Sequence, residues 1–326
     1  MARLVTKLTQ RLSIEHPVLS APMALAAGGA LAAAVTRGGG LGLIGGGYGD
    51  GPWLEHEFGQ TGNTRVGCGF ITWSLAKQRH LLGAALAHRP AALMLSFGDP
   101  QPFAAEIAAA EVPLICQCQS LDHVRHALDA GAAIIVAQGG EAGGHGHRRA
   151  TLPFVPEVAD LLARQSPETL LLAAGGIADG RGLAASLMLG ADGVLVGTRF
   201  WASREALVHA GHHAAAIAAT GDGTVRTSLP DIARRLDWPK PFDIRVADNG
   251  FTRRWAGRDD ELKAVIEQEA PAYRAAFAAG DAQNAAVIFG EAAGLVADVP
   301  SAGEIVTRMV DEAATLLGEK ARGLLG

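Results

Sequence analysis

The sequence predicts a (β/α)8 barrel, also called a TIM barrel, with a small and mostly helical domain inserted late in the chain. Short apolar runs alternate with alanine-rich stretches of helical spacing. Most runs begin about 20–26 residues after the one before, which leaves room for a strand, a helix and two loops. Eight such runs can be counted, the number of strands in this barrel. The length of 326 residues also suits one barrel with an appendage.

The eight runs do not alternate between apolar and polar residues. Short apolar strands of this kind are typical of a parallel sheet that is buried on both faces. A doubly wound sheet usually has about five to seven strands, so eight runs favour the closed barrel. The expected strands are Val18–Ala21, Leu41–Ile44, Val66–Phe70, Ala92–Leu95, Leu114–Gln117, Ile134–Ala137, Leu170–Ala173 and Val194–Val196.

Helices are expected between the strands. Gly28–Val35, Ser120–Ala130 and Gly182–Leu189 have apolar residues at helical spacing. The second and third segments are followed by Gly131 and Gly190, and glycine commonly ends a helix. These segments would belong to the outer ring of the barrel.

The pattern changes in the last third of the chain. Residues 213–270 contain few strand-like runs and more charged side chains. We therefore predict that 213–270 form a small helical domain over the mouth of the barrel, and that 1–212 and 271–326 form the barrel. Helical spacing in 271–296 and 302–317 is expected to supply the last barrel helices.

Composition and charge narrow the classes of function. Apolar residues make up 49% of the chain and charged residues 19%, so a folded core is expected rather than disorder. The net charge of −5 offers no basic surface for a nucleic acid, and no apolar run approaches the ~20 residues that cross a membrane. The polar N-terminal segment lacks the apolar centre of a signal peptide, so a cytoplasmic location is expected.

The three cysteines are Cys68, Cys116 and Cys118, too few for a disulfide framework and without a C-x-x-C pair. All three fall within or beside predicted strands. They are expected to be buried thiols, with a redox pair of Cys116 and Cys118 as the alternative.

A loop rich in glycine and histidine follows the sixth predicted strand. It reads Gln-Gly-Gly-Glu-Ala-Gly-Gly-His-Gly-His over Gln138–His147. Ligands of a TIM barrel bind at the C-terminal ends of the strands. The loop would therefore bring His145 to the active site as an acid, a base or a partner for an anionic substrate. His145 and His147 could bind a metal ion, but Glu141 is the only nearby side chain that would complete the site, and no metal is predicted.

The loops after the seventh and eighth strands predict a phosphate site. Gly175 and Gly176 follow the seventh strand, and Gly197 and Thr198 follow the eighth. TIM barrels often bind phosphate with these two loops and the N-terminus of a short helix. FMN, a sugar phosphate or pyridoxal phosphate would suit such a site. FMN is favoured, because no lysine stands at a predicted strand end for pyridoxal phosphate and the apolar segment Ala21–Met23 suits a flavin ring.

Five segments carry a resemblance to a known family: Ala21–Met23, Gly39–Gly47, Gln138–His145, Ala174–Gly182 and Gly197–Phe200. Together they resemble the nitronate monooxygenases, formerly called 2-nitropropane dioxygenases. The resemblance implies an FMN-dependent enzyme that oxidises alkyl nitronates or nitroalkanes with dioxygen to carbonyl compounds and nitrite. His145 corresponds to the family's active-site histidine, which would steer the nitro group or remove a proton from a neutral nitroalkane.

The resemblance also implies cofactor contacts. Pro22, Met23 and Gly69 would lie near the flavin ring, and Gln117 and Gln138 near the ring edge or the ribityl chain. The other implied contacts, to the flavin or its phosphate, are Gly143, Gly144, Gly175, Gly176, Gly197 and Thr198.

An FMN-dependent enoyl-ACP reductase shares most of these motifs. An NAD(P)H-dependent FMN reductase acting on enoyl-ACP or quinones is therefore the alternative function, and a flavin-binding protein without activity is a third. Arg148, Arg149, Arg234 and Arg235 could form a basic rim for an acidic carrier protein. The first two could equally meet an anionic small-molecule substrate or solvent, and the role of His147 is left open. A homodimer is also left open.

Overall fold

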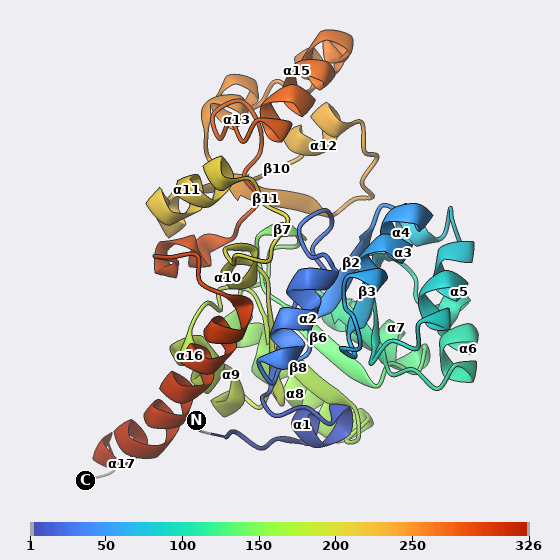
Figure 1. Cartoon of the computed structure of the whole chain (residues 1–326), viewed down its shortest axis with the longest axis vertical. Coiled ribbons are helices and arrows are strands. Elements are labelled where there is room, and N and C mark those ends of the chain that lie inside the picture. Colours follow the sequence, from blue (N-terminus) through green and yellow to red (C-terminus); the bar gives the residue numbers. More distant parts are fainter. Residues whose placement is uncertain (1–2, 325–326) are drawn as a thin grey trace.

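The structure, a computed structural model, describes residues 3–324 as a barrel with a smaller group of elements over one end (Figure 1). Eight parallel strands follow one another in the order β1-β9-β8-β6-β5-β4-β3-β2. A parallel bridge between Leu19 of β1 and Leu41, which lies just before β2, brings the two ends of this order together and nearly closes the sheet. The barrel strands are β1 (Val18–Ser20), β2 (Leu43–Gly47), β3 (Gly67–Ile71), β4 (Leu93–Ser96), β5 (Leu114–Cys118), β6 (Ile134–Gln138), β8 (Leu170–Ala174) and β9 (Gly193–Val196).

The predicted barrel is confirmed, and each of the predicted apolar runs overlaps a strand. Successive side chains of a strand enter different layers of the core. In β6, Ile134 and Val136 pack inside the barrel, while Ile135 and Ala137 pack against the surrounding helices. All four side chains are fully buried. Burial on both faces explains why the strands are continuous apolar runs in the sequence.

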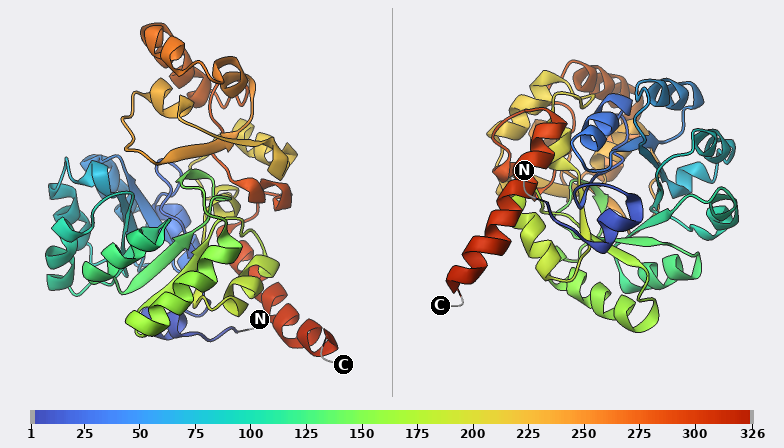
Figure 2. Two further views of the ribbon diagram at one scale, coloured as in Figure 1. Left: turned by 180° about the vertical axis from the view of Figure 1, so that it is seen from behind. Right: turned by 60° about the horizontal axis from the view of Figure 1, so that its bottom comes forward.

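Helices surround the barrel (Figure 2). The three predicted helices are present as α2 (Gly29–Arg37), α7 (Leu121–Asp129) and α9 (Gly180–Met188). The Ser120 hydroxyl caps α7 by accepting the His123 N–H at 3.2 Å. α1 (Lys7–Leu12) inserts Leu8 and Leu12 into the core inside the barrel. Among the described residues, no helix has the length and apolar character needed to cross a membrane. The outer helices are α2 (Gly29–Arg37), α3 (Gly51–Gly59), α4 (Thr72–Leu75), α5 (His80–Ala87), α6 (Gln101–Ala109), α7 (Leu121–Asp129), α8 (Thr151–Gln165), α9 (Gly180–Met188), α10 (Thr198–Trp201) and α16 (Ala302–Thr315), which continues through η3 (Leu316–Lys320) into α17 (Ala321–Leu324).

We call residues 210–278 the cap. The cap has a core of its own that includes Phe251, Trp255 and Tyr273. It is less helical than predicted, because two of its segments are strands that form an antiparallel sheet with a strand from the glycine loop of the barrel. These strands are β10 (Thr224–Thr227), β11 (Asp243–Ala247) and β7 (Gly144–Gly146), and the cap helices are α11 (Ala210–Ala218), η1 (Gly221–Gly223), α12 (Leu229–Arg234), α13 (Gly250–Trp255), α14 (Asp259–Ala264) and α15 (Ile266–Ala278).

The two helices expected near the C-terminus have different places. Within 271–296 only residues 271–278 are α-helical, as the end of α15, which packs against α12 and α14 of the cap instead of the barrel. It does so because Tyr273 belongs to the core of the cap. The chain then returns through a short 3-10 helix, η2 (Glu291–Leu295). The helix expected at 302–317 is α16, which packs on α2 and α9 of the barrel. The exact domain boundaries stay a prediction.

The cysteines are free and buried, as expected. Burial raises the pKa of the Cys68 and Cys116 thiols to about 12, and it also raises the pKa of Cys118. Thiols that stay protonated are poor nucleophiles and poor redox partners. The three residues therefore act as apolar packing groups, and the alternative of a redox pair is not supported.

Candidate active site

A cavity of about 590 Å³ lies between the C-terminal ends of the barrel strands and the cap. Cavities of this size hold cofactors and small substrates. On the cap side its wall includes the apolar side chains of Ile244, Ala286 and Ile288. Every residue predicted for the site lines the cavity except Gly69. These residues are Pro22, Met23, Gln117, Gln138, Gly143, Gly144, His145, Gly175, Gly176, Gly197 and Thr198.

Gly69 of β3 lies behind the cavity wall. A Cβ atom at this position would come within 2.5 Å of Pro22 Cγ and 3.2 Å of Met94 Cβ. The absence of a side chain therefore allows Pro22 to pack closely on β3. Both Pro22 and Gly69 were expected to line the cavity. Only Pro22 does so, and Gly69 packs behind Pro22.

The loops after β8 and β9 expose bare backbone to the cavity. Gly175 and Gly176 have φ angles of +100° and +74°, in the region that favours glycine. A Cβ on Gly176 or Gly197 would meet its nearest atoms at ordinary contact distances, 3.5 Å and 3.8 Å. Within residues 3–324, neither of these two N–H groups has a backbone acceptor. Free donors in the wall of a cavity fit the oxygen atoms of a phosphate group.

The neighbouring polar groups agree with a phosphate ester and disagree with pyridoxal phosphate. The Thr198 hydroxyl accepts the Gly290 N–H at 2.9 Å and keeps its own proton available for a ligand. Glu141 also lines the cavity, and its carboxylate is engaged by Thr151, from which it accepts the N–H and the hydroxyl at 2.9 and 2.8 Å. No lysine is among the described residues that line the cavity, so pyridoxal phosphate has no amine to bind. The residues present fit FMN.

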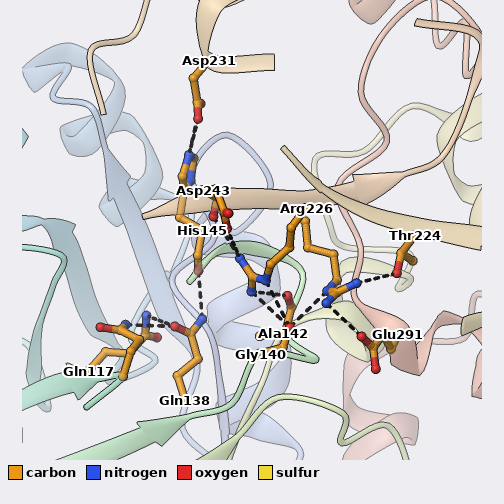
Figure 3. A network of polar contacts seen from close by, with 12 residues as sticks. Gln117, Gln138, Gly140, Ala142, His145, Thr224, Arg226, Asp231, Asp243 and Glu291 are labelled. Carbon is orange, nitrogen blue, oxygen red and sulfur yellow. Dashed lines mark hydrogen bonds and ion pairs between the residues drawn. The ribbon is translucent and has the colours of Figure 1, made fainter. Parts of the chain in front are cut away.

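Glutamine amides connect the barrel to the histidine segment (Figure 3). Gln138 Oε1 accepts N–H groups from Gln117 at 3.2 Å and from Gln119 at 2.9 Å, and Gln138 Nε2 donates to the His145 carbonyl oxygen at 3.1 Å. These contacts fix the orientation of the Gln138 amide. Gln119 was not identified from the sequence, because it lies beyond the strand end and is 1% exposed. The amide oxygen of Gln117 remains available to a ligand.

His145 lies on β7, where it pairs with Ile244 of β11. Its Nε2 is 2.9 and 3.1 Å from the two carboxylate oxygens of Asp231, and its ring stacks on Trp238 with 3.3 Å between the ring centroids. Burial lowers the pKa of His145, although Asp231 acts in the opposite direction. The imidazole is therefore neutral near pH 7 and able to accept a proton.

Asp231 and Trp238 come from the cap, and neither was identified from the sequence. Asp231 also accepts a hydrogen bond from Arg234 Nη2 at 2.6 Å. Trp238 Nε1 donates to the Tyr48 hydroxyl, which follows β2 of the barrel, at 3.1 Å. No local motif marks Asp231, because its histidine partner lies 86 residues earlier in the chain. The high share of charged residues in the cap was the only sequence feature that pointed to polar side chains such as Asp231 near the site.

Two cap arginines hold the loop that precedes β7 (Figure 3). Arg226 on β10 donates to the Gly140 carbonyl oxygen at 3.1 Å and pairs with Asp243 at 2.8 Å. Arg245 on β11 donates to the same carbonyl oxygen at 3.1 Å and pairs with Glu291 at 2.9 Å. Both arginine side chains are largely buried. They anchor the segment that carries His145 to the sheet of the cap.

The three basic residues that follow His145 lie away from the cavity. His147, Arg148 and Arg149 are not among the residues that line it. Arg148 is exposed, while Arg149 forms an ion pair with Glu157 and lies over the ring of Phe154. In the described part of the chain, no group of three or more histidine, cysteine, aspartate or glutamate side chains is placed to hold a metal ion.

Comparison with known proteins identifies relatives along the whole chain. Residues 73–312 match a family described as nitronate monooxygenase. A nitronate monooxygenase of Metarhizium robertsii is 35% identical, over 92% of this chain and 91% of its own. A nitronate monooxygenase of Neurospora crassa is 32% identical, over 91% of this chain and 88% of its own.

Two solved structures share the fold at similar levels of identity. FabK from Thermotoga maritima has a TM-score of 0.86 and 29% identity, over 98% of this chain and 99% of that chain. A nitroalkane oxidase from Streptomyces ansochromogenes has a TM-score of 0.79 and 25% identity, over 98% of this chain and 100% of that chain. With the family match and the two curated relatives, this chain belongs to the nitronate monooxygenase family of flavin-dependent oxidoreductases.

Proposed function

We propose that the protein oxidises alkyl nitronates or nitroalkanes with dioxygen to carbonyl compounds and nitrite, and that FMN is its cofactor. The observation that carries this proposal is the buried side chain of His145 in the wall of a cavity that glycine loops border and the cap covers. Burial lowers the pKa of this imidazole, which keeps it neutral near pH 7. The match to the nitronate monooxygenase family supports the same class of substrate.

FMN would be held on the barrel side of the cavity. The N–H groups of Gly176 and Gly197 would bind its phosphate, Pro22 and Met23 would contact its ring, and the amide oxygen of Gln117 would accept a hydrogen bond. When bound, FMN would supply the redox chemistry by taking electrons from the substrate and passing them to dioxygen.

The chain itself would position the substrate and move a proton. A neutral nitroalkane must lose the proton on the carbon next to its nitro group, and a neutral His145 is a base suited to accept it. A nitronate has already lost this proton, so His145 would only orient its nitro group. Trp238 holds the imidazole ring from one face, and the apolar side chains of Ile244 and Ile288 would limit water around the reacting atoms.

Reduction of enoyl-ACP or quinones by NADH or NADPH is the second candidate. The TM-score of 0.86 to FabK over nearly the whole chain is the observation that favours it. The basic rim expected for a carrier protein is weakened by internal pairing, because Arg149 binds Glu157 and Arg235 binds Glu267 at 2.8 Å. Arg234 lines the cavity and pairs there with Asp231. This pairing favours the nitronate function.

Anaerobic mixing distinguishes the two functions. The purified flavoprotein would be mixed separately with the nitronate of nitroethane, with NADH and with NADPH, while the flavin absorbance is followed. We expect the nitronate to bleach the flavin within seconds and both nicotinamides to leave it oxidised. Bleaching by a nicotinamide with an inert nitronate would assign the protein to the reductases.

Replacement of the histidine tests its place in the reaction. His145→Ala should retain flavin but lose about 10²–10⁴-fold in turnover of neutral nitroethane, the usual contribution of a positioned base. The matched control is His147→Ala, which removes a histidine outside the cavity and should keep its turnover. Oxygen uptake and nitrite release measure both variants, and equal rates for the two would remove His145 from the mechanism.

A further inference from the structure

We propose that Asp231 is a positioning residue that keeps His145 in the tautomer with its proton on Nε2, so that Nδ1 accepts the proton of a nitroalkane. The inference rests on the proposed function for the identity of the substrate. The tautomer itself can be measured whether or not the protein oxidises nitroalkanes.

In the contact between His145 and Asp231, only the histidine can donate the hydrogen bond. The side chains of His145 and Asp231 are 7% and 5% exposed, and both carboxylate oxygens lie within 3.1 Å of Nε2. An ionised carboxylate only accepts hydrogen bonds, so Nε2 must carry the proton. Nδ1 has no protein partner within residues 3–324, and it is not sealed from solvent as Nδ1 of His147 is. The lone pair that can accept a proton is therefore on Nδ1, the ring nitrogen that remains accessible.

Arg234 fixes the carboxylate on its other side. Its Nη2 donates to Asp231 Oδ1 at 2.6 Å, and its Nε donates to the Pro230 carbonyl oxygen at 3.1 Å. A guanidinium group only donates hydrogen bonds, so any side chain that replaces Asp231 must present an oxygen to Arg234 to keep this contact. Oδ1 therefore accepts from Arg234 and also lies 3.1 Å from His145 Nε2, while Oδ2 is the nearer of the two oxygens to Nε2, at 2.9 Å.

Other charged or titratable groups surround the pair. Arg234 and Arg226 both disfavour a second proton on His145, and Asp231 favours it. Burial raises the pKa of Tyr48 and of Tyr273, so both phenols are neutral near pH 7. The only anion in this group is the carboxylate of Asp231, which would stabilise the imidazolium once the proton has been transferred.

The step is a proton transfer without a change of oxidation state. The C–H bond next to the nitro group breaks, and its electron pair remains on the substrate and is delocalised into the nitro group to give the nitronate. The proton forms a bond to Nδ1 of His145. The imidazolium then carries protons on both nitrogens, with Nε2–H still donated to Asp231.

Asp231→Asn provides a sharp test because the new side-chain amide has one oxygen and one NH2 group to place between Arg234 and His145. Arg234 requires an oxygen, which leaves the amide NH2 group facing Nε2 of His145. Because Oδ2 is the atom nearer to Nε2, we expect Nε2 to accept from this NH2 group and the imidazole proton to move to Nδ1. We expect nitrogen chemical shifts of ¹⁵N-labelled histidine, assigned through His145→Gln, to show this change of tautomer. An unchanged Nε2–H tautomer would overturn the proposal.

Kinetics of the two forms of one substrate separate positioning from general damage. For neutral nitroethane, Asp231→Asn should reduce kcat by about 10²–10⁴-fold, because the accessible nitrogen can no longer accept a proton. For the nitronate of nitroethane, which has no proton to lose, we expect a loss below about tenfold. Equal losses for both forms would indicate a structural role. Asp248→Asn, a cap aspartate that binds Arg253 away from the cavity, is the matched control and should change neither rate.

A second variant tests the role given to Arg234. When Arg234→Leu is combined with Asp231→Asn, the amide is free to turn its oxygen towards Nε2. The Nε2–H tautomer should return in the double variant, and part of the nitroethane activity should return with it. Persistence of the Nδ1–H tautomer would contradict the proposed geometry. If wild-type protein fails to oxidise nitroethane but these tautomers are seen, the positioning inference stands and the proposed substrate falls.

Discussion

Gly176 in the cavity wall meets two requirements: its backbone conformation favours glycine, and a side chain at this position would take up cavity space. Gly176 has a φ angle of +74°, where a side chain costs about 1–2 kcal/mol, and it borders the open volume between the β8 and β9 loops. A substitution there would be strained and would also fill part of the cavity. The two effects can be separated with a glycine that has a positive φ angle but lies outside the cavity.

Gly176→Val should abolish flavin retention, because the isopropyl group would occupy the space next to the free N–H groups. Gly62→Val is the matched control, since Gly62 has a φ angle of +59° but its Cβ would meet no atom within 4 Å. Both variants should lose about 1–2 kcal/mol in the free energy of unfolding. The ratio of flavin to protein absorbance after gel filtration decides the result, and a fully loaded Gly176→Val protein would refute the phosphate site.

The strand β7 is an element whose composition does not favour a strand. It consists of Gly144, His145 and Gly146, and glycine is depleted in strands. It exists because β11 pairs with it and because Arg226 and Arg245 bind the carbonyl oxygen of Gly140 just before it. The position of the histidine is therefore a property of the cap sheet.

Arg226→Met tests this dependence at the level of the element. The change leaves the Gly140 carbonyl oxygen and the Asp243 carboxylate without this partner in a largely buried place, which should cost about 1–3 kcal/mol of unfolding free energy. Arg253→Met is the control, because the Arg253 side chain is 68% exposed and its ion pair should contribute less than about 1 kcal/mol. Urea denaturation measures both. Equal losses would show that Arg226 does not anchor the loop.

At the scale of the whole molecule, buried histidines couple stability to pH. Burial is the main cause that lowers the pKa of His16, His123, His145 and His212 in the folded protein. These residues lie in the barrel, at its rim and in the cap, so the effect is distributed over both parts of the fold. Below their ordinary pKa of 6.5, the unfolded chain binds more protons than the folded chain.

The free energy of unfolding should therefore fall as the pH is lowered. The contribution of these histidines is fully present above pH 6.5 and is lost as the pH falls through their lowered pKa values. Urea denaturation at about pH 8 and about pH 5.5 would measure the difference. His212→Gln should make the slope smaller, because it removes one of the contributing groups. Stability that is higher at the lower pH would contradict the assignment of these histidines as buried neutral groups.

The barrel was predictable because its signal is local. Runs such as Ile134–Ala137 are apolar on both faces, and the buried sheet requires that pattern wherever it occurs. The glycine loops of the site were also visible, since each follows its strand directly. Gly69 was placed at the ring by resemblance, yet its neighbour Pro22 forms the wall.

The eight-stranded barrel, the loops that border the cavity and the histidine in its wall could all be read from local sequence patterns. The surroundings of that histidine depend on the folded chain. Asp231 and Trp238 reach His145 from the cap, and α15 joins the cap rather than the barrel. The physical reason is distance along the chain: strand and loop patterns depend on neighbouring residues, while the Asp231 contact forms between residues 86 positions apart and leaves no local periodicity.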